Sequence, residues 1–248
     1  MGVILREGKH SAWVIIDRQE KANSFDEAHL LEFSEKLVTA CNSGKDAVAI
    51  RGAGEKYFST GIDLEVVAGI SSLEDSYRVF VEGMGKVFEG ILLCDKPVIA
   101  AVNGYALGLG FEIVQASDLA VALETAKLGA PAMRWGMIPP VTPMLYYNKI
   151  AAEMVFASRL LTAEEARGLG LVNYTVKTAG ELEDKVESLA SKISETEKWA
   201  RSLAKKTIGV KRLEEIYEGL RLIADAAARR EVSSRIEEFF LKKKRGTS

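Results

Sequence analysis

Apolar runs and amphipathic, helix-like stretches alternate along most of this chain. Five apolar runs predict buried strands, at residues 12–17, 46–51, 97–102, 117–122 and 171–176. After the first run, Ser24 and Glu27 have the spacing of a capping box that opens a helix. Apolar residues at helical spacing mark the inner face of that helix: Leu30, Phe33, Leu37 and Cys41. A strand, a helix and a strand in this order form a βαβ crossover, which favours parallel pairing, so we expect an α/β fold.

Further capping signals predict shorter helices in the middle of the chain. Ser71-Ser72-Leu73-Glu74 carries one such signal, and Thr162 with Glu165 caps a helix that ends at Gly168. Between them, residues 128–140 predict a long loop punctuated by prolines.

From about Gly180 the composition becomes helical and charged. Three stripes of apolar residues recur at helical spacing: Leu182, Val186, Leu189 and Ile193; Ile216, Leu220, Ile223 and Ala227; and Val232, Ile236 and Phe240. We expect these stripes to pack on the body of the protein or on a neighbouring subunit. Trp135 and the pair Tyr146-Tyr147 are likewise predicted to be core or subunit contacts.

Charge and composition exclude several classes of protein. The chain has 248 residues, 48% of them hydrophobic, which is enough for a full core. Lys+Arg 33 against Asp+Glu 35 argues against nucleic-acid binding through a broad basic surface, and Lys242-Lys243-Lys244-Arg245 predicts a solvated tail. There is no run of about 18 apolar residues and no signal-peptide cleavage pattern, so we expect no membrane segment and a cytoplasmic location.

Cysteine and histidine are too scarce to organise the fold or a metal site. Cys41 and Cys94 are too few for a disulfide framework, and no metal-ligand spacing is visible. His10 and His29 leave little room for a histidine-based metal site or triad, and both are predicted to lie at the surface.

The segment 103–112, Asn-Gly-Tyr-Ala-Leu-Gly-Leu-Gly-Phe-Glu, carries the clearest candidate chemistry. It follows a predicted strand and precedes a predicted helix, so its glycines bring free backbone N–H groups to one point. Glu112 is the one acid there, and a carboxylate in an apolar segment must be paired, solvated through a cleft or functionally perturbed. Near Gly61 a similar turn offers further backbone donors, with Asp63 as the cap of the next helix.

These stretches together resemble the crotonase superfamily, the enoyl-CoA hydratase/isomerase family. The matching motifs are 58–64, 103–112, 118–122, 136–139 and 161–166, and the likeness extends from about residue 3 to 240. The resemblance implies a spiral of repeated ββα turns with C-terminal helices used in trimerisation, often as a dimer of trimers. We therefore divide the chain into a spiral CoA-binding core domain, 1–195, and a C-terminal helical region, 196–248.

The resemblance also implies which backbone groups bind the substrate. Two N–H groups, those of Ile62 and Leu109, would grip the thioester oxygen of an acyl-CoA as negative charge develops on it. The positions that match the family's CoA contacts are Lys21, Ala22, Ser24, Thr60, Gly61, Asp63 and Leu64. Glu65 stands where the family often has a lysine, so the contact to the CoA phosphates is weakened. No separate cofactor is expected, because CoA is part of the substrate.

The acid–base residues depart from the family's pattern. Hydratases of this family use two glutamates, and Glu112 matches the first, whereas Ala132 stands at the position of the second. Arg134 could stabilise an anion but cannot donate a proton at a suitable pKa. We hypothesise that Glu112 alone shuttles a proton or orients water against an enolate.

Three other functions remain open at the level of the sequence. A thioester hydrolase or a decarboxylase could run on the same backbone donors with one glutamate or none, and Ala132 also fits a CoA-thioester-binding protein that has lost catalysis. The balanced charge makes RNA binding a poor candidate. The segment 65–92 is expected to shape the acyl pocket.

Overall fold

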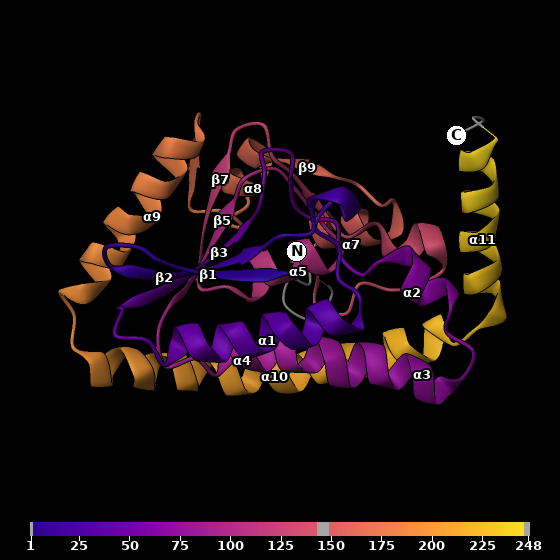
Figure 1. The fold of residues 1–248 in the computed structure, drawn as a ribbon, viewed down its shortest axis with the longest axis horizontal. Coiled ribbons are helices and arrows are strands. Elements are labelled where there is room, and N and C mark those ends of the chain that lie inside the picture. The colour runs from indigo at the N-terminus through magenta and orange to yellow at the C-terminus, as the bar shows by residue number, and fades with distance from the viewer. Residues whose placement is uncertain (1, 143–148, 246–248) are drawn as a thin grey trace.

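The computed structural model describes residues 2–142 and 149–245, and its centre is a six-stranded sheet (Figure 1). The sheet has the order β1-β2-β3-β5-β7-β10, and every pair except the antiparallel β1–β2 is parallel. Its strands are β1 (Val3–Glu7), β2 (Ser11–Ile16), β3 (Ala47–Gly52), β5 (Val98–Val102), β7 (Leu119–Leu123) and β10 (Tyr174–Val176). The parallel pairing of β2 and β3 around α1 (Glu27–Cys41) confirms the predicted crossover.

A second, smaller sheet contains the strands that follow β3, β5 and β7 in the chain. Its order is β4-β6-β8-β9, formed by β4 (Tyr57–Ser59), β6 (Tyr105–Leu107), β8 (Lys127–Gly129) and β9 (Leu161–Thr162). The chain thus passes three times from the large sheet to the small one, as β3–β4, β5–β6 and β7–β8, and each passage leads into a helical segment. This is the repeated ββα arrangement of the expected spiral.

Alternation along the central strands produces two separate cores. Ala12, Val14 and Ile16 of β2 face one side, where they join the cluster that includes α1, α4 (Gly85–Leu92) and α10 (Lys198–Ala227). Trp13, on the opposite side, packs with residues of α9 (Ala179–Ser194). Successive side chains of a strand point to opposite faces, so one apolar run serves both layers.

The C-terminal stripes pack on the body of the protein. Leu182 and Val186 of α9, and Ile216 and Leu220 of α10, are fully buried. α10 lies alongside α4 beneath the large sheet (Figure 1). α11 (Arg230–Lys244) packs against α2 (Leu64–Ala68), at the end of the molecule opposite α9. The predicted boundary at residue 195 falls in the turn between α9 and α10, and independent folding of the two parts stays a prediction.

α10 approaches its neighbours closely enough to exclude a side chain. A Cβ on Gly219 would collide with the carbonyl oxygen of Pro140. Nearer the start of the helix, the buried Lys205 forms an ion pair with Asp118, whose carboxylate also accepts a hydrogen bond from the amide of Val98 at 2.7 Å. The helix is therefore fixed both to the sheet and to the loop that follows β8.

The start of α1 differs from the prediction. Its N-cap is Asp26, whose side chain accepts a hydrogen bond from the amide of His29, and not Ser24. Phe25 is held extended because it bridges to Ile62: its amide donates to Gly61 and its carbonyl accepts from Asp63, both at 2.8 Å. Pairing with a distant strand segment thus delays the helix by two residues.

Several short elements were not predicted. The loop expected at 128–140 contains the end of β8 and a 3₁₀ helix, η3 (Pro131–Trp135), while β6 forms within the expected glycine loop. The strand expected at 171–176 is confined to β10. The capping box of Thr162 and Glu165 is confirmed. The predicted contacts of Tyr146 and Tyr147 lie outside the described residues.

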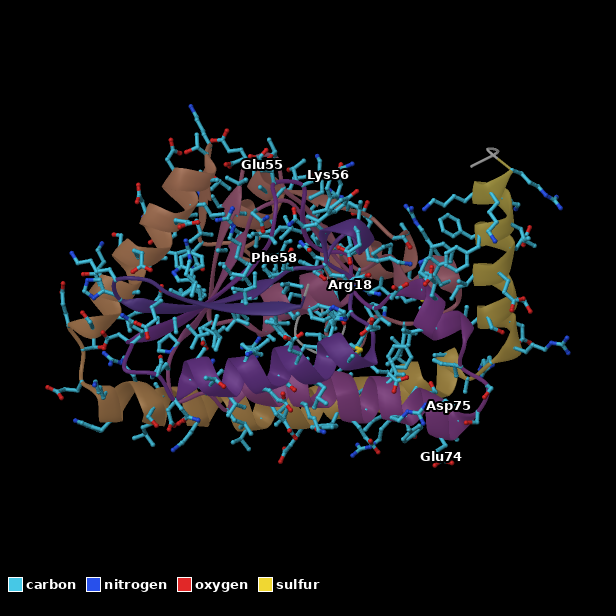
Figure 2. All side chains as sticks on the ribbon, viewed as in Figure 1. Arg18, Glu55, Lys56, Phe58, Glu74 and Asp75 are labelled. Carbon is cyan, nitrogen blue, oxygen red and sulfur yellow. A yellow bond between two sulfur atoms is a disulfide. The ribbon has the colours of Figure 1, made fainter. Side chains whose placement is uncertain are left out.

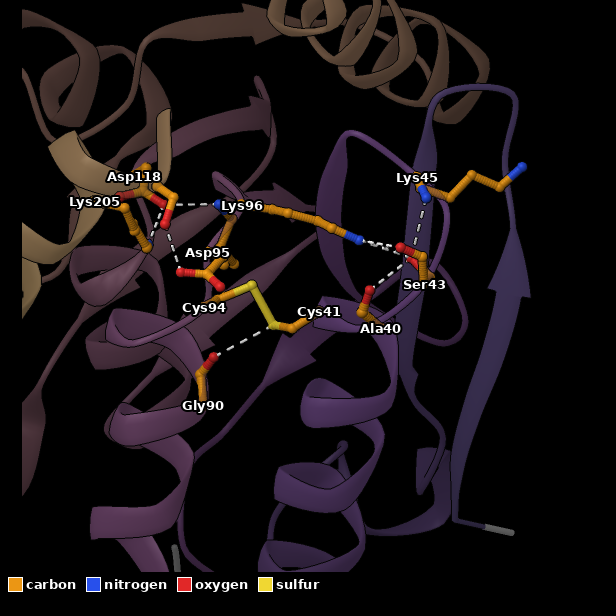
Figure 3. Close-up of a disulfide and its surroundings, with 12 residues drawn as sticks. Ala40, Cys41, Ser43, Lys45, Gly90, Cys94, Asp95, Lys96, Asp118 and Lys205 are labelled. Carbon is orange, nitrogen blue, oxygen red and sulfur yellow. Dashed lines mark hydrogen bonds and ion pairs between the residues drawn. A yellow bond between two sulfur atoms is a disulfide. The ribbon is translucent and has the colours of Figure 1, made fainter. Parts of the chain in front are cut away.

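Cys41 and Cys94 form a disulfide that joins the ends of α1 and α4 (Figure 3). A single bond is no framework, but it closes a loop across a sequence separation of 53 residues. Closing a loop of that length removes unfolded-state entropy worth roughly 2–4 kcal/mol. The sequence gives no signal for this pairing, because it depends on how the two helices pack.

None of the helices within residues 2–142 and 149–245 combines the length and the apolar character needed to cross a bilayer.

Candidate functional site

Two backbone segments meet where the small sheet gives way to helices. β4 pairs with β6, so the turn after β4 and the turn after β6 lie beside one another. At Gly61, where φ is +92°, an added Cβ would lie 2.8 Å from the amide nitrogen of Leu109 and 3.0 Å from the carbonyl oxygen of Leu107. Only a residue without a Cβ allows this approach in the left-handed region. The contact brings the chain around Ile62 next to the predicted second donor.

The geometry leaves the Leu109 amide without a partner inside its own helix. Leu109 is the first residue of α5 (Leu109–Ala116), and the first N–H groups of a helix have no intrahelical acceptor. Ile62 immediately precedes Asp63, which caps α2 by accepting from the amide of Glu65 at 3.0 Å. Asp63 is thus confirmed as a helix cap.

A cavity of about 80 Å³ unites these groups with the candidate acid. The residues that line it come from five parts of the chain: Thr60, Ile62, Leu64, Val67, Phe80, Met84, Gly108, Leu109, Glu112, Ala130, Pro131, Ala132, Trp135, Met137, Ile138, Pro139, Pro140 and Ile223. Among the lining residues that the structure describes, Glu112 alone is ionisable. Ala132 lies in the same cavity, so the position expected to hold a second acid does face the site. Arg134 is exposed and is absent from the lining.

Glu112 is buried with little compensation for its charge. It is 1% exposed, and among residues 2–142 and 149–245 its Oε1 accepts one hydrogen bond, from the amide of Val141 at 3.1 Å. Burial raises the pKa of this carboxyl to about 8, and the hydrogen bond from Val141 opposes that shift. Glu112 lies in the first turn of α5, where the helix dipole also favours the anion. Desolvation is the larger effect, so the pKa of this carboxyl is raised toward the neutral range and the group can both accept and donate a proton near neutral pH.

Two predicted CoA-binding segments lie side by side in the structure. Both the amide and the hydroxyl of Thr60 donate to the carbonyl oxygen of Ala22 at 3.2 Å. The two segments, residues 21–24 and 60–64, form a strip. At its edge, Lys21 forms an ion pair with Glu65 at 2.7 Å, which raises the pKa of Lys21. The acid that replaces the family's lysine is therefore neutralised by a neighbouring lysine from another segment.

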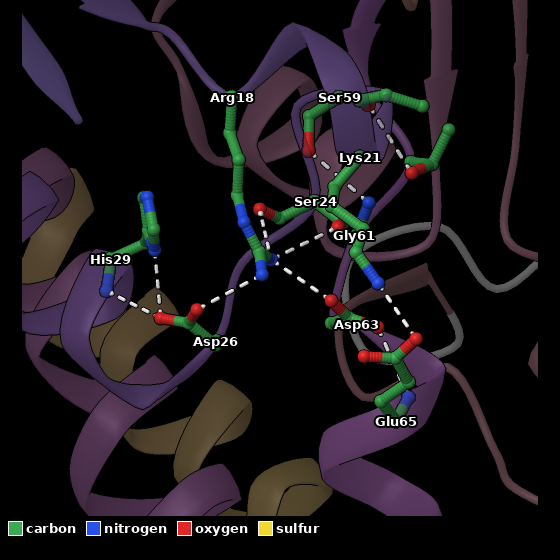
Figure 4. A network of polar contacts seen from close by, with 11 residues as sticks. Arg18, Lys21, Ser24, Asp26, His29, Ser59, Gly61, Asp63 and Glu65 are labelled. Carbon is green, nitrogen blue, oxygen red and sulfur yellow. Dashed lines mark hydrogen bonds and ion pairs between the residues drawn. The ribbon is translucent and has the colours of Figure 1, made fainter. Parts of the chain in front are cut away.

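Arg18 connects the two helix caps that flank this strip (Figure 4). Its guanidinium contacts Asp63 Oδ2 at 2.9 Å and Asp26 Oδ2 at 3.1 Å, and it donates to the hydroxyl of Ser24 at 3.3 Å. Asp26 in turn lies 2.7 Å from the His29 ring. Sequence reasoning missed Arg18, although a lone arginine directly after a predicted strand was visible. Figure 2 shows it and Phe58 within the molecule, while Glu55 and Lys56 lie at the rim.

Other lining residues were expected at the level of their segment or as packing positions, and were not singled out for the site. Val67, Phe80 and Met84 belong to the segment expected to shape a pocket. Ile223 belongs to a C-terminal stripe that was predicted to pack on the body. Trp135 lines the cavity and also packs edge-to-face on Phe239 of α11, with ring centroids 5.0 Å apart.

A spiral of ββα units followed by a C-terminal helical region is the crotonase class of fold. A model of the family described as enoyl-CoA hydratase/isomerase matches residues 8–233. This chain belongs to that family.

Relatives and solved structures agree with this membership. The chain is similar to crotonyl-CoA hydratase of Syntrophomonas wolfei, at 32% identity over 231 residues, which covers 90% of this chain and 87% of the relative. It is also similar to carnitinyl-CoA dehydratase of Escherichia coli, at 37% identity over 187 residues, 73% of this chain and 69% of that protein.

Among solved structures, an enoyl-CoA hydratase from Bacillus anthracis superposes with a TM-score of 0.77 at 30% identity, covering 88% of this chain and 90% of that one. An enoyl-CoA hydratase/isomerase from Xanthobacter autotrophicus has a TM-score of 0.88 over 100% of this chain and 94% of its own. At 23% identity the latter shows the fold alone.

The approach of the two turns predicts that Gly61→Ala is destabilising. A Cβ there would press on the backbone of Leu107 and Leu109 and would occupy a left-handed conformation, at a cost of about 1–3 kcal/mol of unfolding free energy. The matched control is Gly168→Ala, because no heavy atom lies within 4 Å of the added Cβ. Urea unfolding of both variants tests this, and equal midpoints would contradict it.

Burial of Glu112 predicts a specific dependence of stability on pH. Between its ordinary pKa of 4.5 and its folded pKa of about 8, the unfolded chain has released a proton that the folded protein retains. The free energy of unfolding therefore falls as the pH rises through this window, by roughly 1.4 kcal/mol per pH unit from this group. Glu112→Gln lacks this component. Urea titrations at about pH 5 and pH 8 should show a smaller loss in the variant than in the wild type, and equal losses would rule out the burial effect.

Proposed function

We propose that this protein is an acyl-CoA enzyme that hydrates, dehydrates or isomerises an enoyl thioester. The thioester oxygen would lie between the N–H groups of Ile62 and Leu109. The observation that supports this is the single cavity that holds both residues together with Glu112. An enolate oxygen carries the charge that develops in such reactions, and backbone donors fixed by surrounding structure need not reorganise to stabilise it.

Glu112 would both take and give the proton in hydration. Its ionised form removes a proton from water as the oxygen bonds to the β-carbon, and the electrons of the double bond move onto the thioester oxygen. The protonated carboxyl then returns that proton to the α-carbon as the enolate collapses. One water is added, and Glu112 ends as it began. A pKa of about 8 suits this double role, because acid–base catalysis is most efficient when the pKa is near the working pH.

The strip formed by residues 21–24 and 60–64 would bind the CoA moiety through its backbone. Lys21 is paired with Glu65, so its charge is partly committed within the protein. Gly61, Asp63 and Leu64 belong to this strip, and Leu64 also lines the cavity. No further cofactor is required by this chemistry.

Hydration of crotonyl-CoA, followed as loss of the enoyl absorbance, tests this proposal. We expect Glu112→Gln to lose roughly 100- to 10,000-fold in turnover, the range for one acid–base residue. Ala132→Glu would supply a second carboxyl to the same cavity and should raise the hydration rate.

The same assay separates the alternatives. Equal turnover of the wild type and Glu112→Gln would remove Glu112 from the mechanism. Crotonyl-CoA binding without turnover in any variant would favour a decarboxylase or thioester hydrolase, or a protein that only binds CoA thioesters. The absence of a second acid at Ala132 is the observation that keeps these candidates open.

We also propose that the subunits form a homotrimer or a dimer of trimers through α10. Trp199, Leu203 and Val210 lie on one face of this helix and are 70%, 60% and 50% exposed. Leu203→Glu should lower the mass measured by light scattering. Leu222→Glu, which adds a charge on a different face of the helix, should not. A monomeric wild type would refute the proposal.

A further inference from the structure

The cavity has an open side and a closed side. Residues around the predicted donors, such as Thr60, Leu64 and Ala132, are half-buried, so the mouth lies there. The remaining apolar wall includes Val67, Phe80, Met84 and Ile223, and none of these four is more than 4% exposed. A thioester held at the mouth would therefore point its acyl chain toward this closed wall.

The closed wall leaves little space. The cavity measures about 80 Å³, whereas pockets that bury drug-sized molecules occupy roughly 300–1,000 Å³. A long alkyl chain would have to displace the wall, and interiors are packed too densely to yield without cost.

Phe80 and Met84 reach the cavity from an unusual helical segment. They belong to η2 (Arg78–Met84), a π-helix between α3 (Leu73–Tyr77) and α4. π-helical turns are rare and are found mostly at functional sites. Here the segment supplies two large side chains, four residues apart, to one wall.

The backbone of this segment, and of the residue that follows it, packs closely against two other helices. A Cβ on Gly83 would lie 3.0 Å from Leu30 of α1, and one on Gly85 would lie 2.6 Å from the hydroxyl of Tyr217 on α10. That hydroxyl donates to Glu89 at 2.8 Å, which fixes α10 against α4. The π-helix thus packs closely on α1, and the start of α4 that follows it packs closely on α10.

We propose that Phe80 and Met84 set an upper limit on acyl-chain length, so that the site accepts short-chain acyl-CoA thioesters. This inference rests on the proposed function, because it assumes that the chain enters from the side of Ile62 and Leu109. Phe80 and Met84 are specificity-determining residues in this account and take no part in the proton transfer.

Calorimetric binding of butanoyl-, hexanoyl-, octanoyl- and decanoyl-CoA tests the limit. For the wild type we expect affinity to fall at least tenfold between butanoyl- and octanoyl-CoA. Met84→Ala should bind octanoyl-CoA about tenfold more tightly than the wild type, the gain expected for burying roughly two methylene groups. Its affinity for butanoyl-CoA should change little.

Two further variants serve as a control and as a substitute for Met84→Ala. Met154→Ala is the matched control, because Met154 is 1% exposed and lines a different cavity; its chain-length profile should equal that of the wild type. Phe80→Leu keeps the wall apolar while removing ring volume, so it serves if Met84→Ala does not fold, and it should shift the profile in the same direction.

The binding results distinguish failure of the chain-length limit from failure of the proposed function. Failure of the wild type to bind any of the four thioesters would overturn the proposed function. Equal binding of all four by the wild type, or an unchanged profile in Met84→Ala and Phe80→Leu, would overturn the chain-length limit alone.

Discussion

The candidate site depends on a contact between two stretches of backbone that no side chain separates. Gly61 lies against the amide of Leu109, so two turns distant in sequence place Ile62 and Leu109 at one cavity. The paired strands β4 and β6 bring the turns together, and the bridge from Phe25 to Ile62 holds one of them from the other side. Arg18 adds charge to this arrangement by joining the caps of α1 and α2. The arrangement of the two turns is therefore set by main-chain geometry and a few ion pairs.

Glu112, in contrast, lies in surroundings that give its ionised form little stabilisation. Burial among apolar residues raises the pKa of this carboxyl to about 8, and the hydrogen bond from the amide of Val141 offsets only part of that shift. That carboxyl destabilises the folded protein at alkaline pH, and natural sequences tolerate such a cost mainly where a function needs it. A second acid at position 132 would change this balance, since two neighbouring carboxyls influence each other's ionisation.

Much of the fold could be predicted from local sequence, and the failures share one cause. Long apolar runs such as β5 and the Thr162–Glu165 capping box are specified by neighbours in sequence, so they were found. β6 and the true N-cap of α1 depend on pairing with distant strands, which no local pattern reveals. Glu112 and the glycine segment 103–112 were found from the residue pattern, whereas the paired donors Ile62 and Leu109 and the CoA contacts came from the family resemblance. Arg18 was missed because an arginine after a strand is common in proteins. The segment 65–92 was expected to shape the pocket, but Phe80 and Met84 could not be singled out within it, because only tertiary packing shows which side chains of an apolar segment reach the cavity.

The path of α10 has a consequence for how the protein is made. Ile223 closes the cavity, Gly219 packs on the Pro140 loop, and both lie about a hundred residues after Glu112 in the chain. During synthesis the strands and the carboxyl emerge first, so a nascent chain would expose an unfinished apolar pocket to water. The cavity gains its last wall only when α10 has left the ribosome and docked. A chain that ends before α10 would carry the candidate carboxyl in a cavity that lacks the wall formed by Ile223.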